Sequence, residues 1–300
     1  MPEIIGLILN YRDAPRTLRC VSSLLADGAA AVVVLDNSAD DGESASRLLR
    51  ALDGDSRVSV LESRINLGFA AGVNSGIERI RQHAPEAWIL LLNNDATVRT
   101  GALAALSSAL QDDPDAVLAY PWIDHGGHVR AEAYYQPWLG LVTRRPLPGA
   151  VPHASGCAVL FAPQRWGEAL YDEAFFMYGE DAELGFRLRR RKRRMVRVEH
   201  ALVDHEGSAS SGLGSEFYES RMVAAHWLLA RRLASSVLQR NVMYAARFAF
   251  LGARAMLRSL RFRSLVPIRA LVSGWRLAHG RDPLQEFASR ERSRHRRLGA

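Results

Sequence analysis

The sequence predicts an α/β fold in which a mostly parallel sheet is flanked by helices and followed by a helical C-terminal extension. Short apolar segments alternate with helical patterns four times in the first hundred residues, which is typical of a doubly wound parallel sheet. Each apolar segment ends in polar side chains, at the place where such sheets bind their ligands. Of the 300 residues, 48% are apolar, which is enough for a large core.

The first two predicted strands are residues 4–9 and 31–35. Between them lies a helix that Asp13 caps, with Pro15 in its first turn, where a missing N–H is tolerated. A second helix is expected at residues 44–52, because its apolar side chains recur with helical spacing. These segments complete two strand–helix repeats.

The next two repeats surround a glycine-rich run. Residues 58–62 form the third predicted strand, and the run at 66–76 opens a helix that reaches Arg81. Residues 88–92 are apolar without a polar face, which predicts a fourth strand buried on both sides. A helix is expected next, at residues 101–110.

The regular alternation of strand and helix patterns is not recognisable between residues 112 and 152. Several prolines in this region predict irregular loops that present aromatic surface. The aromatic residues either stack on sugar faces or pack beneath the loops; they are Trp122, Tyr134, Tyr135 and Trp138. The elements expected after residue 152 are a strand at 156–161, a helix from Gly179, short strands at 195–198 and 201–203, and helices at 223–233, 242–260 and 265–278.

Polar residues after the strands predict a nucleotide site at one edge of the sheet. The four that we expect to cluster there are Asn10, Asp36, Asn66 and Asp95. The glycine run lacks the spacing of the dinucleotide-binding fingerprint, but it still admits a phosphate or ribose close to the backbone. Asp95 either holds a metal ion or belongs to an ordinary turn with its two asparagine neighbours.

A second acidic cluster opens the helix after Gly179. Glu180, Asp181 and Glu183 are stabilised there by the helix dipole, and the same position suits a general base that removes a proton. His205 follows a predicted strand. A single histidine in such a place is either structural or a partner for Asp95 at the site.

Charge distribution and cysteine content indicate which compartment and which kinds of partner the protein fits. The net charge of +7 is concentrated after residue 230, where sixteen arginines accompany three acidic residues, so the preceding part is net negative. Two distant cysteines in apolar stretches argue against a disulfide framework and fit a reducing cytosol. We expect neither a secretory signal nor a membrane-spanning segment. No nucleic-acid-binding module is recognisable, so we do not expect nucleic acid as a partner.

The C-terminal helices alternate leucine, phenylalanine and tryptophan with arginine. This pattern predicts helices that lie in the interface of an anionic membrane, with the arginines at the lipid headgroups. The alternative is a helical cap with a solvated arginine face, or a contact within a homo-oligomer. We expect one domain at 1–215 and the helical extension at 216–300.

Seven motifs in order resemble the inverting family 2 glycosyltransferases of GT-A fold, and within them the rhamnosyltransferase-like enzymes of bacterial surface polysaccharide synthesis. The resemblance covers roughly residues 4–240. The motifs are Leu9-Asn10-Tyr11, Asp36-Asn37-Ser38 with Asp41-Gly42, Asn66 to Ala70 through Asn74-Ser75-Gly76, Leu92-Asn93-Asn94-Asp95, Ser155-Gly156-Cys157, Phe176 to Asp181, and His205 with Ser208.

The resemblance implies a nucleoside-diphosphate sugar as donor. Asp36 would contact the nucleotide base, and Asn66 with the following glycines would line the base and ribose. The residues that we expect to bind the donor are Asn10, Tyr11, Asp36, Asn66, Gly68, Phe69, Asn74, Asn94 and Asp95.

The resemblance also implies a divalent cation, Mg²⁺ or Mn²⁺. Asp95 matches the last carboxylate of the family's Asp-x-Asp metal motif, and His205 matches a histidine that helps to hold metal or diphosphate. The chain departs from the motif at Asn93, where the fuller motif has aspartate. Loss of that charge predicts weaker cation binding.

Asp181 matches the catalytic base, and Glu180 beside it would orient the acceptor or the base. The implied reaction transfers a sugar, which is rhamnose in the rhamnosyltransferase-like enzymes, to a glycan or lipid-linked glycan with inversion. A cytoplasmic location on the inner face of the plasma membrane would suit a lipid-linked acceptor. The alternative is a catalytically inactive relative that serves as a membrane-associated binding or assembly subunit.

Overall fold

The computed structural model describes residues 2–207 and 212–280. Its contacts divide the chain into two compact units that interleave in sequence. The first comprises Met1–Glu132, Ala154–Tyr171 and Arg187–Ala209, and the second comprises Ala133–His153, Asp172–Phe186 and Ser210–Ala300. A single boundary at residue 215 therefore needs correction, because two earlier segments group with the C-terminal helices rather than with the sheet.

One half of the large sheet in the first unit is parallel, as predicted. Its strand order is β3 (Val58–Glu62), β2 (Ala31–Asp36), β1 (Ile4–Asn10) and β4 (Trp88–Leu92). In the register of β1 and β2, Asn10 lies opposite Asp36. Parallel strands end at the same edge, so the polar residues after them share one edge of the sheet.

The other half of this sheet is mixed. It continues through β11 (Ala158–Phe161), β6 (Ala116–Asp124), β12 (Arg194–His205) and β5 (Ala96–Val98). Strand β11 runs antiparallel to β4 and β6, whereas β12 is parallel to β6. Strand β5 is antiparallel to β12 and brings the residues after β4 next to the end of β12.

The prediction of irregular loops at 112–152 was wrong. The region contains the almost fully buried strand β6, the two-residue strand β7 (Val129–Arg130) and the strands of a small second sheet. Pro121 lies within β6, where a missing N–H normally weakens a strand. Pro121 lies where the β6–β12 register shifts, between Val198 and Leu202 of β12. The two short strands predicted at 195–203 are likewise one strand.

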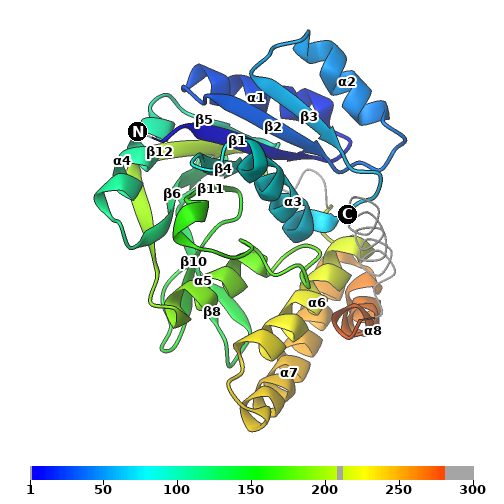
Figure 1. Cartoon of the computed structure of the whole chain (residues 1–300). Helices are drawn as coiled ribbons and strands as arrows, with labels where there is room; N and C mark the ends of the chain where they lie inside the picture. Colours follow the sequence, from blue (N-terminus) through cyan, green and yellow to red (C-terminus); the bar gives the residue numbers. More distant parts are fainter. Residues whose placement is uncertain (1, 208–211, 281–300) are drawn as a thin grey trace, which may run out of the picture. The chain divides into compact units, whose positions relative to one another are not determined.

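Four helices cover the large sheet. Helices α1 (Ala14–Ala26) and α2 (Glu43–Leu52) lie on one face, and α3 (Gly68–His83) lies on the other (Figure 1). Helix α4 (Ala102–Asp112) packs on β6 and β12. As predicted, Asp13 caps α1, since its carboxylate accepts a hydrogen bond from the backbone N–H of Arg16.

Two glycines set the distance between α3 and the sheet. A Cβ atom on Gly72 would lie 2.7 Å from the side chain of Leu9, and one on Gly76 would collide with Leu7. At both positions a larger residue would displace the leucine side chain that packs there, so glycine lets the helix pack closely on β1. This close packing holds the start of α3 beside the ends of β1 and β2.

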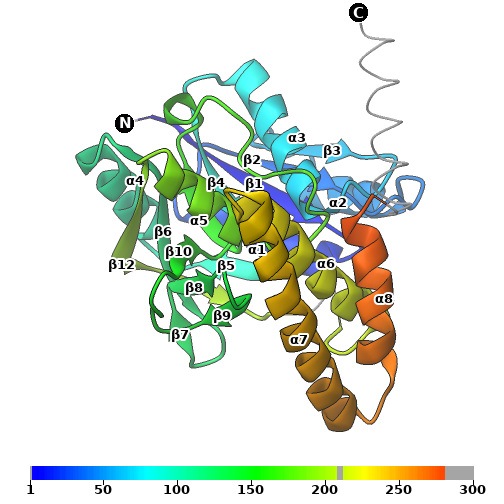
Figure 2. The same ribbon diagram turned by 90° about the horizontal axis from the view of Figure 1, so that it is seen from below.

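The second unit contains a three-stranded sheet and most of the C-terminal helices. The sheet has the order β10 (Val151–Ala154), β8 (Glu132–Gln136) and β9 (Leu141–Thr143). Figure 2 shows the long helix α7 beside its neighbours; the helices of the C-terminal part are α6 (Glu216–Leu233), α7 (Val237–Phe262) and α8 (Val266–Ala278). None of the helices in the described part of the chain is long and apolar enough to span a bilayer.

Candidate functional site

A buried carboxylate lies at the end of β2. Asp36 is 1% exposed, and its Oδ1 atom accepts hydrogen bonds from Asn10 Nδ2 at 2.8 Å and from Ser38 Oγ at 2.5 Å. Its Oδ2 atom is buried without a hydrogen-bond partner among the described residues. A buried acceptor left in this state needs a donor, and the N–H of a bound ligand would satisfy it.

The next residue, Asn37, organises the glycine-rich run, a role that we did not assign from the sequence. Its Nδ2 atom donates to Asn66 Oδ1 and to the Gly68 carbonyl, both at 3.1 Å, and its Oδ1 atom accepts from Leu67 N at 2.8 Å. Gly68 has a φ of 76°, a conformation that favours glycine. The predicted residues Asn66 and Gly68 are thus held beside the end of β2.

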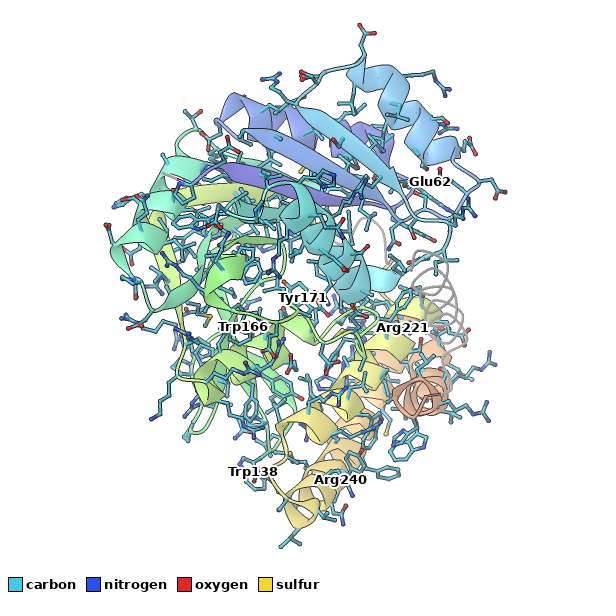
Figure 3. All side chains as sticks on the ribbon, in the orientation of Figure 1. Glu62, Trp138, Trp166, Tyr171, Arg221 and Arg240 are labelled. Carbon is cyan, nitrogen blue, oxygen red and sulfur yellow. The ribbon has the colours of Figure 1, made fainter. Side chains whose placement is uncertain are left out.

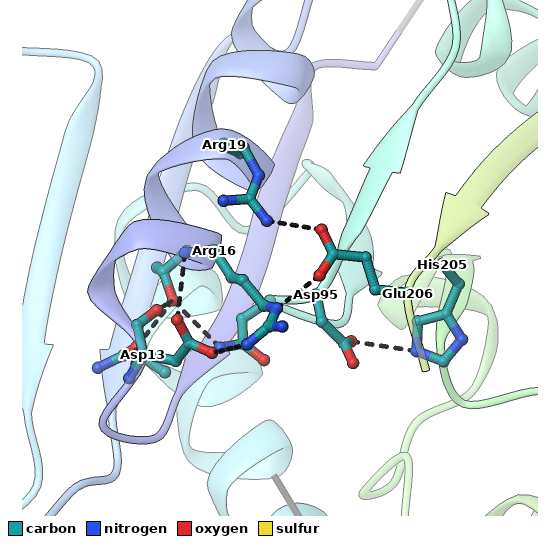
Figure 4. A network of polar contacts seen from close by, with 9 residues as sticks. Asp13, Arg16, Arg19, Asp95, His205 and Glu206 are labelled. Carbon is teal, nitrogen blue, oxygen red and sulfur yellow. Dashed lines mark hydrogen bonds and ion pairs between the residues drawn. The ribbon is translucent and has the colours of Figure 1, made fainter. Parts of the chain in front are cut away.

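Asp95 and His205 are brought together by the pairing of β5 with β12. The Nε2 atom of His205 lies 3.1 Å from the Oδ1 atom of Asp95, and each side chain is 12% exposed (Figure 4). Burial alone would raise the pKa of Asp95, but the hydrogen bond from His205 and its charge outweigh burial and lower it. The carboxylate is therefore ionised at neutral pH.

His125 is a further residue of this group that the sequence analysis missed. Its Nδ1 atom lies 3.1 Å from Nδ1 of His205, on the side of the ring away from Asp95. Burial and the neighbouring His205 lower the pKa of His125, which favours the neutral ring as an acceptor. His125 follows β6, a strand that the prediction of loops had excluded, so no signal in the sequence connected it with His205.

Two arginines of α1 bind the residue after His205. Arg16 Nε and Arg19 NH2 each lie 2.6 Å from a different oxygen of Glu206, and Arg16 also pairs with Asp13 (Figure 4). The backbone N–H of Glu206 donates to the carbonyl of Asp95 at 3.0 Å. These contacts hold the end of β12 in place and so orient His205 toward Asp95.

The Asp95–His205 pair fits a divalent cation. Two adjacent ligand atoms on perpendicular bonds of about 2.1 Å lie about 3.0 Å apart, close to the observed 3.1 Å. Within the described ranges no group of three or more histidine, cysteine or acidic residues is arranged to bind a metal. Two protein ligands leave most coordination positions of such a cation open to water or to the oxygens of a bound ligand.

The contacts of the other residues predicted to bind the donor differ from one residue to the next. Tyr11 is 39% exposed at the end of β1, and Phe69 lies near the ring of Tyr171 with centroids 5.7 Å apart. Asn94 donates to Thr17 at 3.3 Å. Asn74 exchanges two hydrogen bonds with the backbone of Tyr171, a residue that Figure 3 labels, and these bonds give Asn74 a structural role. Ser208 lies outside the described residues.

The predicted base lies in the second unit, at the start of α5 (Glu180–Arg190). Asp181 Oδ2 is 3.4 Å from His153 Nδ1, and the Asp181 side chain is 26% exposed. Burial alone would raise the pKa of Asp181, but the charge and hydrogen bond of His153 lower it below its usual range. An ionised, partly accessible carboxylate can accept a proton. His153 had no distinguishing signal in the sequence.

Glu180, the residue before Asp181, differs from it in burial and in protonation. It is 6% exposed, and its Oε2 atom is buried without a hydrogen-bond partner among the described residues. Burial and then the charge of Asp181 raise the pKa of Glu180 to about 8. Two adjacent carboxyl groups therefore differ in charge at neutral pH, since Asp181 is ionised and Glu180 is protonated.

Sequence comparison assigns the first half of the chain to a known family. Residues 7–162 match glycosyl transferase family 2. The chain is also 26% identical, over 246 residues, to the N-acetylglucosaminyl-diphospho-decaprenol L-rhamnosyltransferase of Mycobacterium tuberculosis. That alignment covers 71% of this chain and 79% of the relative.

Solved structures share the fold at low sequence identity. A crystal structure of GalNAc-T7 with UDP, GalNAc and Mn²⁺ gives a TM-score of 0.57 at 15% identity and covers 82% of this chain but 54% of GalNAc-T7. The mannosyltransferase PcManGT of Pyrobaculum calidifontis, with GDP-Man and Mn²⁺, gives 0.52 at 15% identity, covering 96% and 83% of the two chains. TarS 1–349 of S. aureus gives 0.55 at 12% identity, covering 92% and 81%.

Proposed function

The chain belongs to glycosyl transferase family 2, and from this premise we propose that it transfers a sugar from a nucleoside-diphosphate sugar to a hydroxyl group with inversion. The observation that carries the proposal is the unsatisfied, buried Oδ2 atom of Asp36 at the edge where ligands of such sheets bind. A ring N–H of the nucleotide base would satisfy it. Asn66 and Gly68 would line the ribose, and Tyr11 and Phe69 complete the proposed donor site.

We further propose that Asp95 and His205 hold a divalent cation together with the donor. When bound, the cation would neutralise charge that develops on the diphosphate as it leaves. Mn²⁺ is present in the structures of GalNAc-T7 and PcManGT, which is consistent with a cation in this fold. His125 would orient His205 by accepting its second N–H, as the outer partners of metal-binding histidines do.

Asp181 is the proposed base. It would take the proton from the acceptor hydroxyl while the hydroxyl oxygen bonds to the anomeric carbon and the bond from that carbon to the diphosphate breaks. The nucleoside diphosphate leaves, and no covalent sugar–protein intermediate forms. His153 would keep Asp181 ionised, and the protonated Glu180 would offer an O–H to the acceptor or to Asp181.

The rhamnosyltransferase relative supports a proposal for the substrates. Its name describes transfer of L-rhamnose to an N-acetylglucosaminyl-diphospho-decaprenol. We propose rhamnose as the sugar and a lipid-linked glycan as the acceptor, within bacterial surface polysaccharide synthesis. A cytoplasmic chain bound peripherally to the inner face of the plasma membrane would reach such an acceptor.

An inactive relative that serves as a binding or assembly subunit is the second candidate. Asn93 favours it, because the fuller metal motif has a second carboxylate there. The lowered pKa values of Asp95 and Asp181 favour the enzyme, since both carboxylates remain ionised in their surroundings.

The test is nucleoside-diphosphate release across a panel of sugar nucleotides, each with Mn²⁺ or with EDTA. In parallel, the shift in thermal unfolding on adding each donor measures binding. Release with at least one donor is expected. Donor binding without nucleoside-diphosphate release, whichever acceptor is added, would favour the inactive subunit. If no donor binds, the proposed nucleotide site is refuted, and the proposed enzyme with it.

A further inference from the structure

Helix α7 carries arginines on its inner side, beside the buried Met243 and Leu251, and exposes several large apolar side chains on its outer side. Arg247 is completely buried, whereas the next residue, Phe248, is 79% exposed. A helix at the surface of a water-soluble domain has the opposite arrangement. The alternation of apolar residues with arginine predicted arginines at lipid headgroups, and the structure corrects this for Arg247, Arg254 and Arg258, which point inward.

The inward arginines of α7 are committed to contacts within their own unit. Arg247 donates to the carbonyls of Pro137 at 2.7 Å and His226 at 2.8 Å, and to the hydroxyl of Tyr135 at 3.0 Å. Burial and then the charge of Arg247 lower the pKa of His226 to about 3, so that ring stays neutral. These bonds join α7 to α6 and to the region of β8.

The next inward arginines bind one buried carboxylate. Glu219 on α6 is 0% exposed and accepts hydrogen bonds from Arg254 at 3.0 Å and from Arg258 at 2.8 Å. Arg247 and Arg254 are seven residues apart, a spacing that keeps them on one side of the helix. These polar contacts and the packing of Leu251 on the same side set the orientation of α7, and the opposite side faces outward.

That outward side is an apolar stripe. Its large side chains follow at helical spacing, exposed alanines fill the positions between them, and the stripe is about 33 Å long at 1.5 Å per residue. The large residues, exposed between 49% and 79%, are Leu238, Val242, Phe248, Met256, Leu257 and Leu260. Water-exposed apolar surface of this extent marks a binding surface.

The stripe continues into the turn between α7 and α8. An open hollow of about 400 Å³ is lined by Met256, Leu260, Leu265 and Ile268, with Arg263 also at its wall. The exposed arginines between residues 261 and 280 are Arg261, Arg263, Arg269 and Arg276. From residue 231 to residue 280 the sequence contains ten arginines and no acidic residue.

We infer that the outward stripe of α7, with the hollow at its end, docks on an anionic lipid surface. The apolar side chains enter the headgroup–acyl boundary, and the exposed arginines pair with lipid phosphates. A second copy of the chain fits the same stripe poorly, because pairing through it would bring two sets of unpaired arginines together. The inference rests on the proposed membrane location and adds the surface that makes the contact.

The test is flotation of the full-length chain with vesicles of phosphatidylglycerol and phosphatidylcholine, compared with phosphatidylcholine alone. Phe248→Glu and Leu260→Glu should each lower the partition coefficient about tenfold or more, because each removes a large apolar group from the contact and adds a repelled charge. Leu49→Glu is the matched control, since Leu49 is 56% exposed on α2 in the first unit. It should bind as the unchanged chain does.

Unchanged binding of both α7 variants would overturn the inference. So would a dimer, seen by sedimentation without lipid, that Leu260→Glu dissociates, because a second copy would then cover the stripe. Thermal unfolding of each variant verifies that it folds. Protection of the unchanged chain from thermal unfolding by the donor is measured separately, in solution without vesicles. If the donor gives no protection, the proposed nucleotide site is wrong, but the proposed lipid surface is not affected.

Discussion

Asp95 Oδ1 and His205 Nε2 lie 3.1 Å apart, although 110 residues separate them in the sequence. The pairing of β5 with β12 creates this contact, because His205 lies opposite Ala96 in the ladder. The two arginines of α1 that bind Glu206 reinforce it. The relationship converts a single carboxylate after a strand into a pair that fits a cation.

The first prediction concerns cation binding. Asp95→Asn should lower the affinity for Mn²⁺ in the presence of donor about tenfold or more, because the pair loses its charged ligand. Asn93→Asp should raise the affinity, because it restores the second carboxylate of the motif. Electron paramagnetic resonance of free Mn²⁺ measures both. Equal affinities in the two variants and the unchanged chain would place the cation elsewhere.

The second prediction concerns the proposed base. Asp181→Asn should retain donor binding and lower kcat by about 10²–10⁴-fold, the usual contribution of a positioned base. Donor protection from unfolding and product formation are compared for the same sample. Normal turnover in this variant would refute the assignment, whereas loss of donor binding would show that Asp181 acts on the donor.

The third prediction concerns pH and stability. The pKa of Glu180 is raised from about 4.5 to about 8, so between these values the folded chain binds more protons than the unfolded chain. The contribution of Glu180 to the free energy of unfolding should therefore be largest below about pH 4.5. This contribution should fall by a few kcal/mol as the pH rises toward 8.

Glu180→Gln tests this dependence, because the amide cannot ionise. Denaturant unfolding from pH 5 to 8 should show a flatter profile for the variant and greater stability at pH 8. Parallel profiles for the two proteins would mean that Glu180 ionises normally in the folded chain. Glu183→Gln is the neighbouring control in the same helix turn.

The fourth prediction concerns the packing of α3. Gly76→Ala should lower the free energy of unfolding by about 1–3 kcal/mol, because its methyl group would collide with Leu7. Gly252→Ala on α7 is the matched control, since a Cβ there meets nothing within 4 Å. Alanine should leave stability unchanged or raise it by about 1 kcal/mol there. Thermal or denaturant unfolding at fixed pH distinguishes the two positions.

Local patterns predicted the parallel half of the sheet well. The strand expected at 58–62 has the bounds of β3, and Asp13 caps α1, because apolar periodicity and capping are encoded by neighbouring residues. The C-terminal helices were also expected, although α7 begins five residues earlier than predicted. The family resemblance assigned specific roles to Asp36, Asp95 and Asp181, which the residue patterns had already marked as candidates.

The sequence by itself determined the strand–helix repeats, the polar residues at the strand ends and the acidic start of α5. Only the tertiary structure decided which of them meet. The β5–β12 pairing brought His205 to Asp95, and β6, concealed by Pro121, brought in His125. The tertiary structure also turned Arg247 and Arg254 of α7 inward, because a backbone carbonyl and Glu219 of the same unit bind them. Long-range pairing and buried polar contacts depend on residues far apart in the chain, and local periodicity carries no record of them.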